Sequence, residues 1–305
     1  MRIDMEFRSG RGTRALLNGA PLPRLRSLGE VFVCVFFGPD ELSLVKGSPD
    51  GRRRFVDELV VKLRPARERL RREWERVLKQ RNSLLKSIRR EGPGARGSLD
   101  VWNDALCSAG AELASARLKA LAALVPHARK RYEEVAGGGT LELAYESSWL
   151  GEELSREALD MPPDVRVLQE SLAARLRRVA PGEFERGITL AGPHRDDVVV
   201  RLTSRDGEAP LMDARTYASQ GEQRTSALGL KLGEHDLLTE ALGQQPVLLL
   251  DDVFSELDPH RRTWLAEAVR SLGQTILSTA EPGAVEAATP DKVLRIEGGR
   301  VVPDG

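Results

Sequence analysis

The pattern of hydrophobic and polar positions changes its period along the 305-residue chain. Near the start, Ile3, Met5 and Phe7 alternate with charged residues, which predicts a half-buried strand. An unbroken apolar run over 31–37 predicts a buried strand. From about 52 to 136 the period becomes helical, so the chain passes from strands to long helices.

The helical region carries an amphipathic stripe with a spacing of seven residues. Its main positions are Leu63, Leu70, Val77 and Leu84. The sequence Gly-Pro-Gly at 92–94 interrupts the stripe, and a second helix is expected from about 98 to the three glycines at 137–139. Two long helices joined by a short link predict an antiparallel arm.

Beyond the arm the pattern becomes mixed. Alternation over 141–145 predicts a strand, and a one-sided apolar stripe over 164–179 predicts another helix. After about 188, short apolar segments alternate with helical ones, which is typical of parallel strands covered by helices.

Composition excludes several classes of protein. Lys plus Arg number 46 and Asp plus Glu number 46, so only local patches of charge can indicate a polyanionic partner. Cys34 and Cys107 lie in unrelated contexts, which excludes a disulfide framework and a cysteine metal site. The start lacks the apolar core of a signal peptide, and the run over 31–37 is far too short to span a membrane. We therefore expect a cytoplasmic protein with no membrane partner.

Two adjacent carboxylates follow a short apolar segment. Four apolar residues at 247–250 predict a strand buried on both faces, and Asp251 and Asp252 stand at its carboxyl end. Ligands of α/β sheets bind at this end, where one carboxylate can hold hydrated Mg²⁺ and the next can orient an attacking water. A strand that simply ends in a polar turn is the alternative.

Two helix starts flank this strand, and each allows two interpretations. Asp258 can cap a helix that begins at Pro259. Ser219 and Glu222 have the spacing of a capping box, which explains them without any ligand. The same helix start, with Gly221 allowing close approach, also suits a phosphate oxygen. The order of the three segments favours the functional interpretation.

This ordered set resembles the head of an ABC-type ATPase, and the resemblance implies roles. Asp251 would bind Mg²⁺ through water, Asp252 would polarise the hydrolytic water, and Thr279 would occupy the switch position, where many transporters have histidine. The implied signature residues, which would contact ATP held by a second subunit, are Ser219, Gln220, Gly221, Glu222 and Gln223. The implied D-loop residues are Ser255, Glu256, Leu257 and Asp258.

Three further stretches, at 44–55, 80–86 and 192–197, resemble the RecF family of SMC-like DNA repair proteins. The similarity extends from about residue 15 to 302. It implies an α/β fold, namely an N-terminally incomplete ABC-type ATPase head (P-loop NTPase fold) with an inserted α-helical arm. The expected parts are 1–56 and 187–305 for the head, and 57–186 for the arm with a short strand near 140–146.

The family resemblance also implies activity and partners. We expect ATP and Mg²⁺ as cofactors, an ATP-dependent homodimer, and DNA bound at junctions of single-stranded and duplex DNA. RecO and RecR would be partners in loading RecA during gap repair. Whether the chain is an enzyme stays open, because family members are weak ATPases and this sequence lacks their phosphate-binding loop.

The missing element is the Gly-x-x-x-x-Gly-Lys-Ser/Thr loop, for which no Walker A residue can be assigned. One explanation is a fragment or truncated gene model with the loop encoded upstream. The other is a short variant that kept DNA or partner contacts without nucleotide chemistry. We favour the first. A head without this unit is expected to expose apolar surface and to leave strand edges unpaired.

The first predicted helix of the arm is strongly basic. Residues 62–90 hold twelve Lys and Arg side chains against three Glu, which suits contact with phosphates, although a solvated coiled-coil face would look similar. The candidate DNA contacts are Arg52, Arg53, Arg54, Arg71, Arg72 and Arg76.

Three functions therefore compete. The first is a RecF-like repair ATPase, and the second is a module that binds DNA or RecR without hydrolysis. The third, a nucleotide-binding subunit of a transporter, is disfavoured because the arm is too long and too basic for that role.

Overall fold

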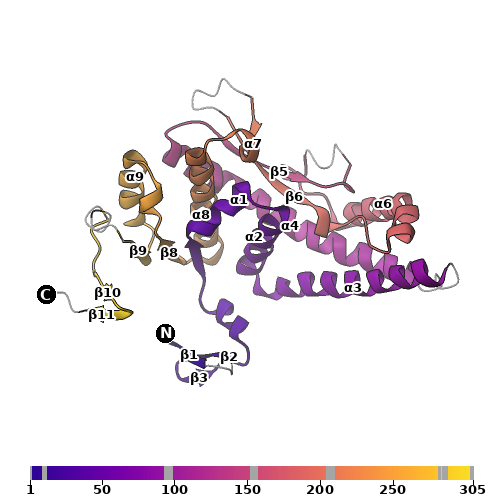
Figure 1. Ribbon diagram of the computed structural model, residues 1–305, viewed down its shortest axis with the longest axis horizontal. Helices are drawn as coiled ribbons and strands as arrows, with labels where there is room; N and C mark the ends of the chain where they lie inside the picture. Colours follow the sequence, from indigo (N-terminus) through magenta and orange to yellow (C-terminus); the bar gives the residue numbers. More distant parts are fainter. Residues whose placement is uncertain are drawn as a thin grey trace.

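The computed structural model describes residues 2–8, 12–92, 99–151, 157–203, 210–280, 283 and 288–302. Figure 1 shows a helical arm extending to one side of a mixed α/β body, with two small hairpins below that body. None of the helices in these described ranges is long and apolar enough to cross a membrane.

The arm is built from long helices that pack along one another. They are α2 (Pro49–Leu63), α3 (Glu68–Glu91), α4 (Leu99–Ala136) and α6 (Val165–Arg186). The predicted stripe faces inward, because Leu70 and Val77 are buried against the other helices. The first expected helix is split by a 3-10 turn, η3 (Pro65–Arg67), since proline cannot continue the hydrogen bonding of the preceding helix.

The central sheet of the body has three parallel strands in the order β4-β8-β9. They are β4 (Cys34–Phe37), β8 (Val247–Asp251) and β9 (Thr275–Ser278). On one face, Leu248 and Leu250 are buried in the same core cluster as the helix α8 (Gln220–Leu242).

The opposite face of this sheet is open to solvent. Phe36, Leu249 and Ile276 are paired side by side across the three strands, and Phe36 is 41% and Ile276 55% exposed. Two predictions were therefore wrong: β8 is covered on one face rather than two, and the strand expected over 31–37 is shorter. The expected exposure of apolar surface is confirmed, and in the described part of the chain β9 pairs with β8 alone.

A second sheet is antiparallel. The prediction of parallel strands from 188 onward is therefore confirmed for β8 and β9 and wrong for the two strands of this second sheet that lie beyond 188. The strands of the second sheet are β5 (Leu141–Glu146), β6 (Asp197–Leu202) and β7 (Met212–Asp213). Burial alternates strictly along β5 and β6, as expected for strands with one face on the core.

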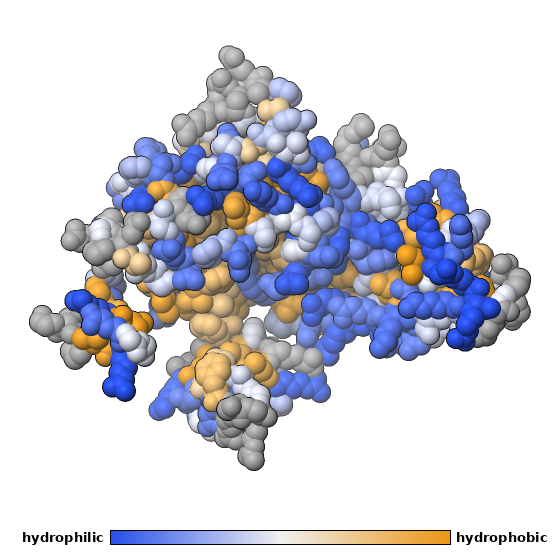
Figure 2. Space-filling view, viewed as in Figure 1, coloured by the Kyte–Doolittle hydropathy of each residue, from blue (hydrophilic) through white to orange (hydrophobic). Residues whose placement is uncertain are grey.

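The hairpins and short elements complete the fold. The first hairpin turns at Asn18 and Gly19, both with positive φ, as Asn-Gly turns between strands require. Figure 2 shows apolar residues on the surface of both hairpins. The remaining strands are β1 (Ile3–Arg8), β2 (Gly12–Leu17), β3 (Ala20–Pro21), β10 (Arg295–Glu297) and β11 (Arg300–Val302). The remaining helical elements are η1 (Leu25–Glu30), η2 (Pro39–Leu42), α1 (Ser43–Lys46), η5 (Pro193–Arg195), α7 (Ala214–Tyr217), η6 (Phe254–Glu256) and α9 (Pro259–Val269).

Candidate functional site

Two adjacent carboxylates stand at the carboxyl end of β8. Asp251 is exposed, and the hydroxyl of Ser278 on β9 donates a hydrogen bond to its Oδ1. Asp252 has a φ of 51°, in the left-handed region that residues other than glycine rarely adopt. Its Oδ1 is buried, and no group among the described residues donates a hydrogen bond to it. A strained backbone and a buried oxygen without a hydrogen-bond donor are typical of residues at ligand-binding sites.

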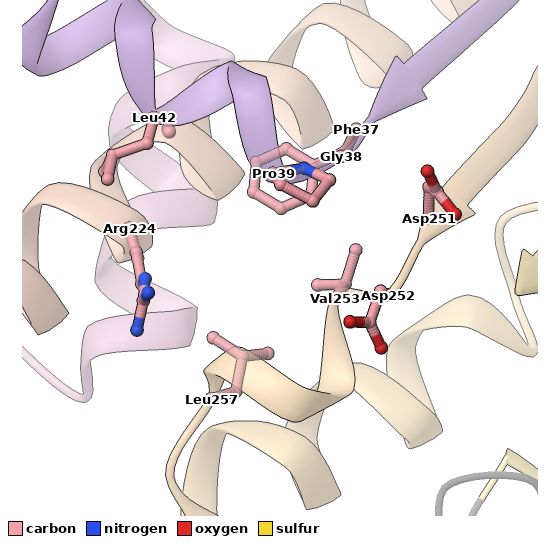
Figure 3. Close-up of a pocket in the computed structure, with 10 residues that line it drawn as sticks. Phe37, Gly38, Pro39, Leu42, Arg224, Asp251, Asp252, Val253 and Leu257 are labelled. Carbon is pink, nitrogen blue, oxygen red and sulfur yellow. The ribbon is translucent and has the colours of Figure 1, made fainter. Parts of the chain in front are cut away.

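The carboxylates line an open pocket, in which the space between the walls, open solvent included, is about 340 Å³. Figure 3 shows Asp251 and Asp252 on one side of it, Arg224 on the other, and the Gly38-Pro39 turn between them. Its other walls are apolar, as is usual for a small-molecule site. The pocket therefore has Arg224 of α8 on one side, Asp251 and Asp252 at the end of β8 on the other, and apolar residues between them.

The donor set fits one kind of metal binding only. Among the described residues, no cluster of three His, Cys, Asp or Glu side chains could hold a metal ion without further ligands. Mg²⁺ usually keeps several waters and takes one or two carboxylates together with substrate phosphates. Asp251 and Asp252 could serve a hydrated Mg²⁺ in this way.

The predicted signature forms the start of α8. Ser219 Oγ accepts a hydrogen bond from the backbone N–H of Glu222, and the Glu222 carboxylate accepts one from the Ser219 N–H. The predicted capping box is therefore confirmed. Ser219 and Gln220 are exposed, so the helix start is accessible to a ligand.

Gln223 lies inside the protein rather than at this surface. Its side chain is buried, and its amide N–H groups point to the backbone carbonyls of Ala214 and Ala218, at 3.1 and 3.2 Å. The residue thus holds the short helix α7 against the start of α8, and we expect it to support the signature without touching a nucleotide.

The predicted D-loop turns back immediately after the carboxylates. Ser255 Oγ donates to the Asp252 carbonyl at 2.9 Å, and Leu257 is buried. Asp258 Oδ1 accepts from the N–H of Arg261 at 3.1 Å and so caps α9 as predicted, while Glu256 ends the η6 turn.

Neighbouring strands bring the predicted switch position, Thr279, close to the carboxylate pair. Asp251 is paired with Ser278, and the N–H of Asp252 donates to the Ser278 carbonyl at 3.0 Å. Thr279 follows directly and is half-buried. Sequence reasoning missed the supporting role of Ser278, and only its position before Thr279 could have indicated it.

The arginine triplet in α2 consists of one buried, one half-buried and one exposed residue. Arg52 is buried in a double hydrogen bond with Asp197, at 2.8 and 2.7 Å. Arg53 donates to the carbonyl of Asp196. Only Arg54 is exposed, so the expected DNA contact through Arg52 is replaced by a structural role.

Arg71, Arg72 and Arg76 on α3 are exposed as a DNA contact would require. Each forms an ion pair with a glutamate one turn away on the same helix; the partners are Glu75, Glu68 and Glu73 respectively. Such surface pairs contribute little to stability, so these arginines can exchange a glutamate for a phosphate at small cost.

Two of the twelve basic residues over 62–90 form ion pairs inside the protein and are not available on its surface. Arg81 is 1% exposed and pairs with the buried Glu183, at 2.6 Å. Lys62 pairs with the buried Glu234 at 2.7 Å, and these contacts raise its pKa although burial acts in the opposite direction. The basic surface of α3 is therefore smaller than the sequence suggests.

The segment 192–197 forms a buried polar hub. Asp196 accepts hydrogen bonds from the hydroxyl of Tyr145 at 2.7 Å and from the indole N–H of Trp149 at 2.9 Å. Burial raises the pKa of Asp196 to about 6. Arg117 donates to the carbonyl of Pro193 at 2.7 Å. This stretch therefore joins α4, β5 and β6 and does not itself form an open site.

Comparison with known proteins places the chain among DNA repair proteins, although no protein-family model matches it. It is 43% identical over 284 residues to the DNA replication and repair protein RecF of Streptomyces avermitilis, covering 91% of this chain and 71% of the relative. It is 38% identical over 323 residues to the RecF protein of Beutenbergia cavernae, covering 98% and 79%.

Solved structures agree with the sequence relatives. Structures of the recombination mediator protein RecF in the RecFOR pathway, one of RecF-ATPrS and one of RecF-ATP, each match with a TM-score of 0.80 at 28% identity, over 98% of this chain and 75% of theirs. The expected fold class, an α/β ABC-type ATPase head with an inserted helical arm, is confirmed. The chain belongs to the RecF family.

Proposed function

We propose that this protein acts in DNA replication and repair by binding DNA along its helical arm and a nucleotide at its head. The observation that carries the proposal is the 43% identity, over 91% of the chain, to a DNA replication and repair protein. In this proposal, residues 57–186 form the arm, and 1–56 and 187–305 form the two parts of the head.

At the head, Asp251 and Asp252 would hold hydrated Mg²⁺ and orient the attacking water. Ser219, Gln220 and Gly221 would contact ATP held by a second head of an ATP-dependent homodimer. The buried, unpartnered oxygen of Asp252 supports this role. RecO and RecR would be the partners with which the protein aids RecA loading at junctions of single-stranded and duplex DNA.

The DNA-binding part is tested by charge reversal on α3. The triple variant Arg71→Glu, Arg72→Glu, Arg76→Glu should weaken binding to a junction oligonucleotide in fluorescence anisotropy. Each lost phosphate contact flattens the slope of log affinity against log salt by about 0.9, so the slope should fall by up to about 3.

A matched control carries the same change of charge elsewhere. Arg166, Arg270 and Arg295 are exposed and lie on α6, at the end of α9 and on β10. Reversing these three should leave the slope nearly unchanged. An equal loss in both triple variants would mean that only overall charge matters and would refute a DNA contact at α3.

A second function is a DNA-binding or RecR-binding module without nucleotide chemistry. It is favoured by the lack of a Gly-x-x-x-x-Gly-Lys loop in the sequence. Calorimetric titration of the chain and of its Asp252→Asn variant with Mg-ATP separates the two functions, because only binding at the proposed nucleotide site should depend on Asp252. The 305-residue chain should bind ATP weakly under either; tight binding, abolished by Asp252→Asn, would establish the nucleotide site and overturn the module.

A further inference from the structure

One arginine lies beside two segments of the candidate site, 219–223 and 255–258, that are about thirty residues apart in the sequence. Arg261 stands in the first turn of α9, and its side chain is 12% exposed. Its Nη1 lies 3.1 Å from Oδ2 of Asp258, while its backbone N–H donates to Oδ1 of the same carboxylate. Arg261 is therefore fixed to the last residue of the D-loop by two contacts.

The same guanidinium lies against the signature. A Cβ added to Gly221 would come within 3.1 Å of Arg261 Nη1, closer than the ordinary contact distance of about 3.5–4.0 Å. Gly221 lies in α8 and is not among the glycines with positive φ, so backbone freedom does not require glycine there. The space that the missing side chain leaves is occupied by the guanidinium.

Local helix stability does not explain this placement. A cation in the first turn of a helix interacts unfavourably with the helix dipole, and Arg261 lies near the starts of both α9 and α8. Asp258 offsets this cost only in part, because its carboxylate is 46% exposed. A role that spans the two segments accounts for the position better.

We propose that Arg261 is a positioning residue that locks the D-loop to the signature, so that their exposed residues, Ser219, Gln220, Ser255 and Asp258, present one rigid surface. The D-loop is tied in turn to the carboxylate pair through Ser255 and the carbonyl of Asp252. A displacement at Gly221 is thereby transmitted to Asp252 through Arg261. The use of that surface for a nucleotide or a second head rests on the proposed function.

Hydrogen–deuterium exchange of the whole chain, without nucleotide or DNA, tests the connection. Alanine is a better helix former than glycine, so Gly221→Ala by itself should slow exchange in α8. The contact with Arg261 predicts, in addition, at least threefold faster exchange in the peptide covering 253–258. Arg261→Met should speed exchange there and at 219–223 by a similar factor, whereas Arg270→Met, at the exposed end of α9, should change neither.

The double variant Gly221→Ala, Arg261→Met decides between coupling and two separate effects. Coupled residues give non-additive changes, so its D-loop exchange should not exceed that of Arg261→Met. Additive changes, or a Gly221→Ala effect confined to α8, would overturn the proposal. Where Arg261→Met does not fold, Arg261→Lys replaces it, because lysine keeps the charge beside Asp258 but lacks the planar group over Gly221. Since no nucleotide is present, the exchange result does not depend on whether the chain binds ATP, so it can fail or hold independently of the proposed function.

Discussion

The arm should be strongly destabilised when the buried pair of Arg81 and Glu183 is broken from one side. Arg81 donates to both carboxylate oxygens, at 3.2 and 2.6 Å, and both side chains are almost fully buried. Arg81→Met would leave the Glu183 charge buried, with the N–H of Leu190 still donating to its Oε1 at 2.8 Å. Breaking such a pair from one side costs about 3–5 kcal/mol.

This cost can be measured by urea unfolding followed by far-UV circular dichroism. With a slope of about 3 kcal/mol per molar urea, the midpoint should fall by about 1 to 1.7 M. Lys86→Met, an exposed position on the same helix, should shift the midpoint by less than about 0.2 M, since such surface changes stay within about 0.5 kcal/mol.

The double variant Arg81→Met, Glu183→Leu removes both charges and should recover at least half of the loss, because no uncompensated charge remains. A midpoint for Arg81→Met within 0.3 M of the unmodified protein would refute the reasoning. So would a double variant no more stable than Arg81→Met.

Three further predictions concern single groups. Burial raises the pKa of Asp196 to about 6 from 3.8, so the folded state favours its protonated form, and stability should fall as pH rises from about 4 to 6. Asp196→Asn should make the melting temperature less dependent on pH over that range. A dependence equal to that of the unmodified protein would contradict this. Burial also raises the pKa of the Cys107 thiol to about 11. A thiol reagent at pH 8 should therefore modify Cys34 quickly and Cys107 only on unfolding. A time course of labelling would show the difference. Ser219→Ala removes the cap of α8 and should lower the free energy of unfolding by about 1 kcal/mol in a denaturation curve, whereas no loss would mean that Glu222 alone caps the helix.

Local patterns in the sequence predicted local structure well. The spacing of Ser219 and Glu222 predicted a capping box, and alternation over 141–145 predicted β5. Both depend on residues a few positions apart, whose geometry is set by the backbone of one element. The carboxylate pair at the end of β8 was predicted for the same reason.

Contacts between distant segments were not predictable. The charge of Arg52 and Arg81 is visible in the sequence, but their partners Asp197 and Glu183 lie more than 100 residues away. An arginine in a basic segment therefore looks like a surface residue until the fold supplies its carboxylate. Likewise, the contact of Arg261 with Gly221 depends on how α8 and α9 pack, which no single-element pattern contains.

The pairing of β4 with β8 sets an order for folding during synthesis. Cys34 is in register with Val247, so about 210 residues, including the whole arm, are made between the two partners. At a translation rate of about 5–20 residues per second, roughly 10 to 40 s pass between the synthesis of β4 and that of β8. The helices α3 and α4 lie close together in the sequence and can pack during this interval, which shortens the remaining loop. The nascent chain should therefore acquire its arm first, and the sheet that carries Asp251 should close only after β8 and β9 have been made.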